Sequence, residues 1–221
     1  MVNRNTVHQI WKREGPAFPT RRLSRKIRPG QHLPLQAEYL NHIWICDFIF
    51  DQTSQGTPLK ILTLTDEFTR RSLAIRCGTA FTSTDVKAVL KTAFKTNGVP
   101  TILRSDNGPE FIAHDLGDWL AEQQVIKKHI DPGKPWQNGI AESFHSRLRD
   151  GLLNVEVFSS PGQASCRASI LPKKHAQVLV GAWLAFCNVI RPHSSLGYRT
   201  PDEFTVLYTA TRAANTAVHS P

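Results

Sequence analysis

Three acidic side chains, Asp47, Asp106 and Glu142, occupy positions from which carboxylates can do chemistry. Asp47 interrupts the β-branched and aromatic run 41–50, which predicts a buried strand. A carboxylate in such a strand needs a partner, because burying it unpaired is costly. A hard divalent cation, Mg²⁺ or Mn²⁺, prefers oxygen ligands and leaves coordination positions for water and phosphate. The sequence therefore predicts that these three residues bind metal.

The other two carboxylates fall on elements that would fix them in place. Asp106 follows the short apolar run 101–103, where a strand should end. Apolar residues around Glu142 recur at steps of three and four, which predicts a helix with one buried stripe: Ala141, Phe144, Leu148 and Leu152. At the same spacing from Glu142, its polar face carries His145, Ser146 and Arg149. Taken singly, a solvated helix glutamate and a turn-forming aspartate remain the ordinary interpretations.

Two further aspartates are weaker metal candidates. Asp51 shares the face of Asp47 if the strand continues, but at roughly 3.3 Å per residue it lies about 13 Å further on. That is too far for metal ions about 4 Å apart. Asp66 belongs to the predicted turn 66–70, where an aspartate usually shapes the turn. The segment 131–135, DPGKP, cannot be regular structure and should be a loop that delivers the Glu142 helix.

Three long motifs extend the pattern beyond isolated carboxylates: SDNGPEF at 105–111, PGKPWQNGIAESFHSRLRDGLLN at 132–154 and NVIRPHSSLGYRTPDEF at 188–204. They resemble the second-frame (OrfB-type) transposases of bacterial insertion sequences that encode their transposase in two overlapping frames. Thirty-five residues separate Asp106 from Glu142. With this spacing, the three carboxylates look like the DDE triad of transposases and retroviral-type integrases.

The resemblance implies an α/β fold of the RNase H-like type, a mixed five-stranded sheet flanked by helices. In that fold the first aspartate lies on the first strand, the second follows the fourth strand, and the glutamate lies on a later helix. It also implies Mg²⁺-dependent DNA strand cleavage and strand transfer. Asp47 would bridge two ions while Asp106 and Glu142 each complete one coordination shell, so that attacking and leaving oxygens are both stabilised.

The resemblance also indicates which residues would touch DNA. Arg149, two turns beyond Glu142, matches the basic position that contacts the DNA end in related enzymes, although a plain surface arginine is the alternative. The other candidates belong to the rim of the site or to a segment packed beside it: Lys134, Trp136, Gln137, Asn138, His145, Arg191 and His193.

Composition and charge point to a basic appendage on one domain. The chain has 221 residues, 40% of them hydrophobic, and a net charge of +9. Residues 1–40 hold eight Lys and Arg against two acidic residues, which favours a polyanionic partner over a merely solvated tail. With the family resemblance, this predicts a basic arm over 1–36 that resembles the remnant of the family's helical DNA-binding module, a catalytic core with a C-terminal extension over 37–205, and a disordered tail over 206–221.

Cysteine and hydropathy patterns exclude other classes. The four cysteines form no zinc-ligand spacing and are best explained as core thiols, unlike the zinc module that precedes retroviral integrase cores: Cys46, Cys77, Cys166 and Cys187. The longest apolar run, 178–187, is too short to span a bilayer. We therefore expect a cytoplasmic protein with no membrane partner, associated with the nucleoid when bound to DNA.

Local patterns within the core predict its remaining elements. Alternation at 59–65 indicates a strand that forms a hairpin with the first strand, and a third strand follows at 72–77. Thr82 should cap a helix that runs through Phe94, and another helix is expected over 114–124. Residues 159–174 are longer than the family pattern, as in a tolerated loop or an unselected insertion.

These features predict a transposase that acts on the ends of its own insertion element. Synapsis of two ends favours a homo-oligomer on DNA, with a first-frame transposase subunit as a further partner. Two alternatives stay open. One is a structure-specific nuclease with the same metal chemistry. The other is an inactive, truncated remnant that binds DNA without cutting it, to which the short N-terminus and the 159–174 insert both point.

Overall fold

The computed structural model describes residues 35–52, 58–131, 138–153 and 173–218. The predicted basic arm up to residue 34, the loop residues 132–137 and the predicted insert up to residue 172 lie outside the described residues. All that is described belongs to a structural unit that begins at Leu35.

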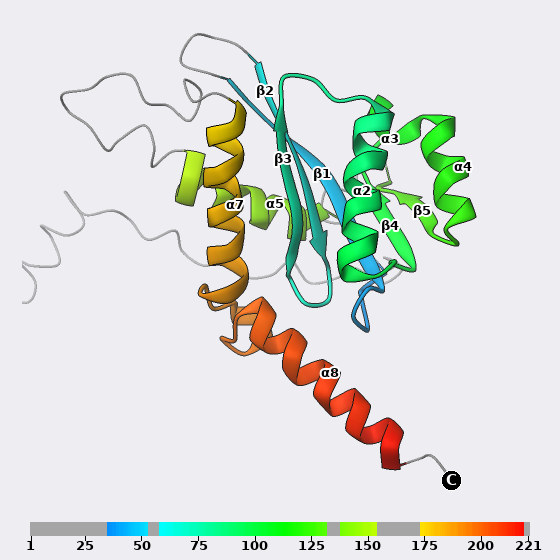
Figure 1. Ribbon diagram of the computed structural model, residues 1–221, viewed down its shortest axis with the longest axis vertical. Helices are drawn as coiled ribbons and strands as arrows, with labels where there is room; N and C mark the ends of the chain where they lie inside the picture. The colour runs from blue at the N-terminus through cyan, green and yellow to red at the C-terminus, as the bar shows by residue number, and fades with distance from the viewer. Residues whose placement is uncertain (1–34, 53–57, 132–137, 154–172, 219–221) are drawn as a thin grey trace, which may run out of the picture. The chain divides into compact units, whose positions relative to one another are not determined.

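A five-stranded mixed sheet forms the centre of this unit (Figure 1). Its order is β3-β2-β1-β4-β5, in which β1, β2 and β3 are antiparallel while β4 and β5 run parallel to β1. The strands are β1 Ile43–Gln52, β2 Pro58–Asp66, β3 Ser72–Gly78, β4 Ile102–Ser105 and β5 Ile126–His129. The predicted β1–β2 hairpin and third strand are confirmed.

Strand β1 is buried on both faces, which explains its nearly continuous apolar sequence. Trp44, Cys46 and Phe48 face one hydrophobic cluster, and Ile49 faces the other. Because successive side chains of a strand point to opposite faces, Asp47 lies on the same face as Ile49. Asp47, the only acidic residue in the buried part of β1, therefore points to the same side of the sheet as the cluster that contains Ile49.

Helices cover both faces of the sheet (Figure 1). The first cluster contains residues of α2 Ser83–Asn97, α3 Pro109–Ile112 and α4 His114–Glu122. Thr82 and Asp85 form a reciprocal capping box at the start of α2, as predicted. The second cluster contains residues of α5 Gly139–Leu148, of its π-helical continuation η2 Arg149–Leu153, and of α7 Lys173–Val189. The predicted apolar stripe of α5 and η2 is buried in full.

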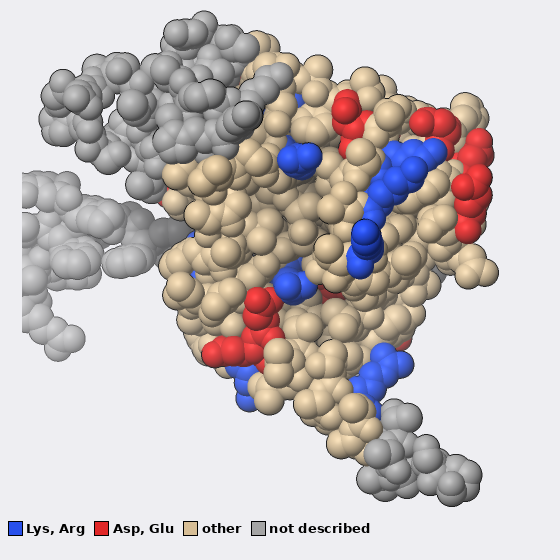
Figure 2. Space-filling view, viewed as in Figure 1, with Lys and Arg blue, Asp and Glu red and all other residues tan. Residues whose placement is uncertain are grey.

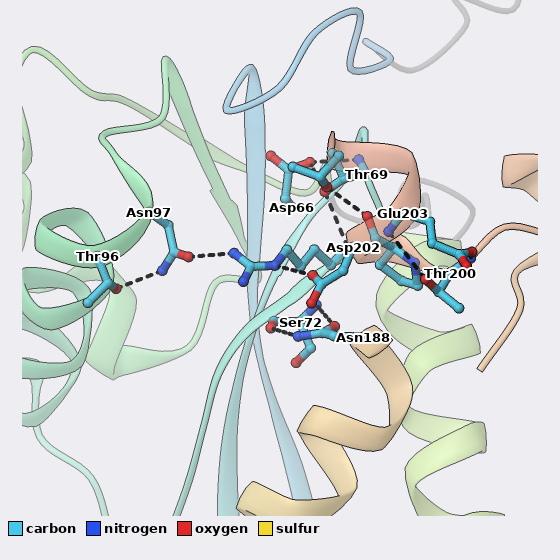
Figure 3. Close-up of polar contacts among 12 residues, drawn as sticks. Asp66, Thr69, Ser72, Thr96, Asn97, Asn188, Thr200, Asp202 and Glu203 are labelled. Atoms are coloured by element: carbon cyan, nitrogen blue, oxygen red, sulfur yellow. Dashed lines mark hydrogen bonds and ion pairs between the residues drawn. The ribbon is translucent and has the colours of Figure 1, made fainter. Parts of the chain in front are cut away.

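Helix α7 covers the edge of the sheet that is formed by β3. The amide of Asn188 accepts a hydrogen bond from the Ser72 backbone N–H (2.9 Å) and donates one to the Ser72 carbonyl (2.8 Å), as Figure 3 shows. Further along, Gln177 donates to the carbonyl of Ile75 (2.9 Å). These two amides satisfy backbone groups that an edge strand otherwise leaves unpaired.

Asn188→Ala is expected to destabilise the fold by about 2–4 kcal/mol, because it leaves a buried N–H and a buried C=O of Ser72 without partners. Chemical denaturation of the variant measures the loss. Gln123→Ala, at the exposed C-terminal end of α4, is the control. Equal stability of the two variants would contradict this role of Asn188.

The prediction of a disordered tail over 206–221 is wrong for residues 206–218, which belong to α8 Pro201–Val218. The start of this helix is fixed by contacts distant in sequence. Rings of Phe204 and Tyr208 pack on Phe68 at centroid distances of 5.5 and 4.9 Å, and Asp202 accepts a hydrogen bond from Arg71 at 2.7 Å. Figure 3 shows Asp202 and its polar contacts near the start of α8. Anchoring at its first two turns lets an Ala- and Thr-rich segment continue as helix.

The described cysteines are core thiols. Burial raises the pKa of Cys46 well above its usual value and that of Cys77 to about 11, so both stay protonated. Cys187 is half-buried, and Cys166 lies outside the described residues. No helix in the described ranges combines the length and apolar composition needed to cross a bilayer.

Candidate functional site

Asp47 is held at the middle of the sheet by two hydrogen bonds. Its Oδ1 accepts the Phe48 backbone N–H at 2.8 Å, and its Oδ2 accepts the side-chain amide of Asn138, the residue before α5, at 2.7 Å. Across the antiparallel ladder it is opposite Thr63, whose hydroxyl donates to the Asp47 carbonyl (3.1 Å). Only 8% of Asp47 is exposed, so its carboxylate is largely desolvated.

Asp106 is brought next to Asp47 by the parallel pairing of β1 and β4. Cys46 pairs with Ser105, so Asp47 and Asp106, the residues that follow them, come next to each other where the β1–β4 pairing ends. One carboxylate oxygen of Asp106 accepts the Gly108 N–H at 3.0 Å, which makes Asp106 a turn former as well. A Cβ on Gly108 would come within 3.1 Å of that oxygen and 3.2 Å of Glu110 Oε2, so a larger residue there would have to push these two side chains aside. The turn uses one of the two carboxylate oxygens of Asp106.

Glu142 lies on α5 with its side chain exposed, one turn before His145. His145 is in contact with the layer beneath: its Nε2 is 3.1 Å from Thr63 Oγ1, and its Nδ1 is 3.9 Å from Asp47 Oδ2. At the end of α5, Arg149 donates to the carbonyl of Phe50 at 3.2 Å. The helix thus places Glu142, His145 and Arg149 along the C-terminal half of β1.

The carboxylates repel one another. The pKa of Asp47 is raised, first by burial, and the charges of Asp106 and Glu142 raise it further against the hydrogen bonds from Asn138 and Phe48. The pKa of His145 is lowered to about 4 by burial and by Arg149, so at neutral pH this imidazole brings no positive charge to Asp47. The three carboxylates therefore concentrate negative charge here, which favours a bound metal ion.

The donor set fits magnesium in its chemistry. All three candidate ligands are carboxylates, the oxygen donors that Mg²⁺ prefers. Among the described residues, however, no three His, Cys, Asp or Glu side chains are close enough together to hold an ion. The amide of Asn138 occupies Asp47 Oδ2, and the exposed Glu142 is not drawn inward. Metal binding would require the side chains of these residues to move together.

The predicted DNA-contacting residues divide into three groups. Asn138 bonds to Asp47, His145 lies near it, and Arg149 bonds to the Phe50 carbonyl further along β1. Lys134, Trp136 and Gln137 lie outside the described residues. Arg191 and His193 belong to a separate pocket, which we call the arginine pocket. The residues lining its larger chamber, of about 220 Å³, are Thr65, Arg70, Gly139, Ile140, Ser143, Phe144, Arg147, His193 and Ser195. Arg191 lines an adjoining smaller chamber together with Arg70, Arg147 and His193.

His193 is expected to make the protein less stable in acid. Burial, followed by the charges of Arg147, Arg70 and Arg191, lowers its pKa from 6.5 to about 4. The unfolded chain therefore takes up a proton at a higher pH than the folded chain does. Stability is lost as the pH falls from about 6.5 towards 4, by on the order of 1 kcal/mol for this partly exposed side chain. Melting temperatures of wild type and His193→Gln at pH 7 and pH 5 measure this, and an equal drop in both proteins would contradict it.

Comparison with known proteins decides the family. Models of the integrase core domain match residues 38–135 and 123–201. An insertion element IS407 protein of Burkholderia multivorans is 31% identical, over 98% of this chain and 74% of its own length. An insertion element IS476 protein of Xanthomonas euvesicatoria is also 31% identical, over 100% of this chain and 60% of its own length. The chain belongs to the integrase core domain family of insertion-sequence transposases.

Solved integrase structures confirm the RNase H-like fold of this integrase core. The HTLV-2 integrase catalytic core, determined in complex with magnesium, has a TM-score of 0.58 and 17% identity, covering 75% of this chain and 97% of that one. The catalytic core of BIV integrase has a TM-score of 0.55 and 18% identity, covering 80% and 99%. In this fold Asp47 lies on the first strand, Asp106 follows the fourth, and Glu142 lies on a later helix, as predicted.

Three residues of this integrase core escaped the sequence-based prediction. Thr63 connects β2 to both Asp47 and His145, and the only available signal was its alternation with apolar residues in β2. Arg70 and Arg147 meet in the arginine pocket although they are far apart in sequence. The spacing of Arg147 four residues after Ser143 marks a shared helix face but does not show what that face meets.

Proposed function

We propose that this transposase cleaves DNA strands and joins them to target DNA in a reaction that depends on divalent ions, with Asp47, Asp106 and Glu142 as metal ligands. The observation that supports this most directly is electrostatic. Carboxylates from β1, from the end of β4 and from α5 are close enough for Asp106 and Glu142 to raise the pKa of the buried Asp47. A site with this charge and oxygen-only donors is suited to two Mg²⁺ or Mn²⁺ ions.

When bound, such ions activate the attacking oxygen and stabilise the leaving oxygen of a phosphodiester. The chain's own residues position the site. The Phe48 N–H holds one oxygen of the Asp47 carboxylate, and the Asn138 amide would leave the other oxygen when an ion binds. His145, neutral at pH 7, bonds to Thr63 and so fixes this face of α5 against β2. Arg149, fixed by the Phe50 carbonyl, presents a guanidinium next to this side for a DNA phosphate.

The partners follow from the same proposal. The substrates are the terminal repeats of the insertion element and a target DNA, and joining two ends requires at least two active sites, hence a homo-oligomer on DNA. A solved relative of the fold is an intasome of simian T-cell lymphotropic virus, with a TM-score of 0.63 over 87% of this chain and 61% of that one. A first-frame transposase subunit would contribute to recognition of the ends.

Strand cleavage and joining on a labelled duplex that carries the element's terminal repeat tests the proposal. Wild type should cut and join in Mg²⁺ but not in EDTA. Asp106→Asn should lose roughly 1000-fold or more of both activities because one metal ligand is removed. Asp118→Asn, an exposed change on α4, is the control and should retain activity. Equal activity of wild type and Asp106→Asn would refute the assignment.

One observation supports a second candidate, a DNA-binding protein without catalysis. Among the described residues the three carboxylates do not converge on a metal position. In that case wild type and Asp106→Asn would bind the terminal repeat equally well, and neither would cut it in Mg²⁺ or Mn²⁺. The same assay therefore separates the two candidates.

A further inference from the structure

The arginine pocket gathers basic side chains from three separate parts of the chain. Arg70 comes from the turn between β2 and β3, Arg147 from α5, and Arg191 and His193 from the segment after α7. On the face shown in Figure 2, in contrast, basic side chains over α2 lie close to acidic side chains over α4. The pocket therefore differs from that surface in collecting charge of one sign.

Arg70 has unmet hydrogen-bonding capacity. Its Nε and Nη1 are buried and have no hydrogen-bond partner among the described residues. Its backbone φ of 61° lies in the left-handed region, and the turn that imposes this φ is held by Asp66, which accepts hydrogen bonds from the N–H and hydroxyl of Thr69. Buried donors without acceptors are costly. A ligand that supplies acceptor oxygens would remove that cost.

Like charges surround the Arg70 guanidinium. Burial lowers the pKa of both Arg70 and Arg147. The positive charge of Arg147 lowers the pKa of Arg70 further, and the charge of Arg191 lowers that of Arg147. Two acidic residues, Glu67 and Asp66, counter this at Arg70. Both are already engaged, Glu67 in an ion pair with Arg104 and Asp66 in its turn. The pocket keeps an excess of positive charge.

Neutral donors complete the lining. His193 Nδ1 accepts a hydrogen bond from the Ser195 backbone N–H at 3.3 Å, so in the neutral ring the proton is on Nε2. Ser143 adds a hydroxyl group, whereas the hydroxyl of Ser195 donates to His193 Nδ1 at 2.8 Å and fixes the ring. Guanidinium groups combined with hydroxyl and imidazole donors match the several acceptor oxygens of a phosphate group.

We propose that the arginine pocket binds a phosphate group of a DNA strand, on the flank of α5 opposite the carboxylates. Ser143 and Arg147 line the pocket, whereas His145 contacts Thr63 and lies near Asp47. Residues two apart on a helix point about 200° apart, so α5 separates the two sites. The choice of DNA as the source of the phosphate rests on the proposed function. The pocket's affinity for phosphate does not.

The test uses the full chain in EDTA, so that neither readout depends on cleavage. In the first readout, inorganic phosphate is compared with chloride at equal ionic strength, and wild type should gain a few °C in melting temperature. Arg147→Gln should lose this gain, while Arg147→Lys should keep part of it. Arg76→Gln, an exposed change on β3, is the control and should respond as wild type does.

The second readout is the salt dependence of binding to a terminal-repeat duplex. Arg147→Gln should lower the slope of log K against log salt by about 1, the contribution of one phosphate contact, and Arg76→Gln should leave it unchanged. Arg191→Gln is the second variant in case Arg147→Gln unfolds. A phosphate response that is the same in all variants would overturn the pocket as an anion site. A lost phosphate response with an unchanged DNA slope would overturn DNA as its source.

Discussion

Asp47→Asn is expected to abolish strand cleavage, by roughly 1000-fold or more, and at the same time to raise the melting temperature of the metal-free protein. The loss of activity follows from its proposed role as a metal ligand. The gain in stability follows from removing a buried negative charge that Asp106 and Glu142 repel. Asn138 Oδ1 is buried and has no hydrogen-bond partner in the described part of the chain, so the new amide N–H₂ would find an acceptor there. We expect a rise of roughly 2–4 °C, which corresponds to about 1 kcal/mol in a domain of this size.

Melting curves with and without Mg²⁺, alongside the cleavage assay, measure both effects. Wild type should be stabilised by added Mg²⁺, and Asp47→Asn should lose most of that response. Asp51→Asn, four residues further along the same strand and exposed, is the matched control and should retain activity and the Mg²⁺ response. A variant that melts below wild type in EDTA would show that the Asp47 charge is balanced by groups other than metal.

Glu67→Leu is expected to cost about 3–5 kcal/mol of folding stability, because it leaves the Arg104 guanidinium buried without its counter-charge. Glu67 Oε2 and Arg104 Nη1 are 2.7 Å apart, and each side chain is 6% exposed. Burial raises the pKa of Glu67, although the charge of Arg104 opposes this shift. Removing both charged groups from water therefore costs free energy that their attraction offsets in part. Urea unfolding of the variant gives the loss.

The double variant Glu67→Leu/Arg104→Met is the critical comparison. Replacing both charges with apolar side chains removes the unpaired guanidinium, so the double variant should be more stable than Glu67→Leu alone by about 2 kcal/mol or more. A double variant less stable than Glu67→Leu would show that Arg104 stabilises the fold mainly through other contacts, such as its hydrogen bond to the Leu35 carbonyl.

The sequence by itself determined the elements that carry the candidate site. The spacing of Ala141, Phe144 and Leu148 predicted a helix and its buried face, because helical periodicity is a property of neighbouring residues. The apolar residues on both sides of Asp47 predicted that its carboxylate is buried, which again depends only on neighbouring residues. The position of Asp106 after a short apolar run predicted a residue at a strand end, which the β1–β4 pairing confirmed. The long motifs then indicated the family to which the chain belongs.

Only the tertiary structure decided what these elements meet. Asn138 bonds to Asp47 across 91 residues, and Arg71 bonds to Asp202 across 131. The second contact helps turn a predicted disordered tail into α8. Arg70, Arg147 and Arg191 form one pocket only because the β2–β3 turn, α5 and the end of α7 pack together. Such contacts depend on chain segments far apart in sequence, whose pairing no local pattern encodes, because periodicity records which face of an element is buried and not what is packed against it.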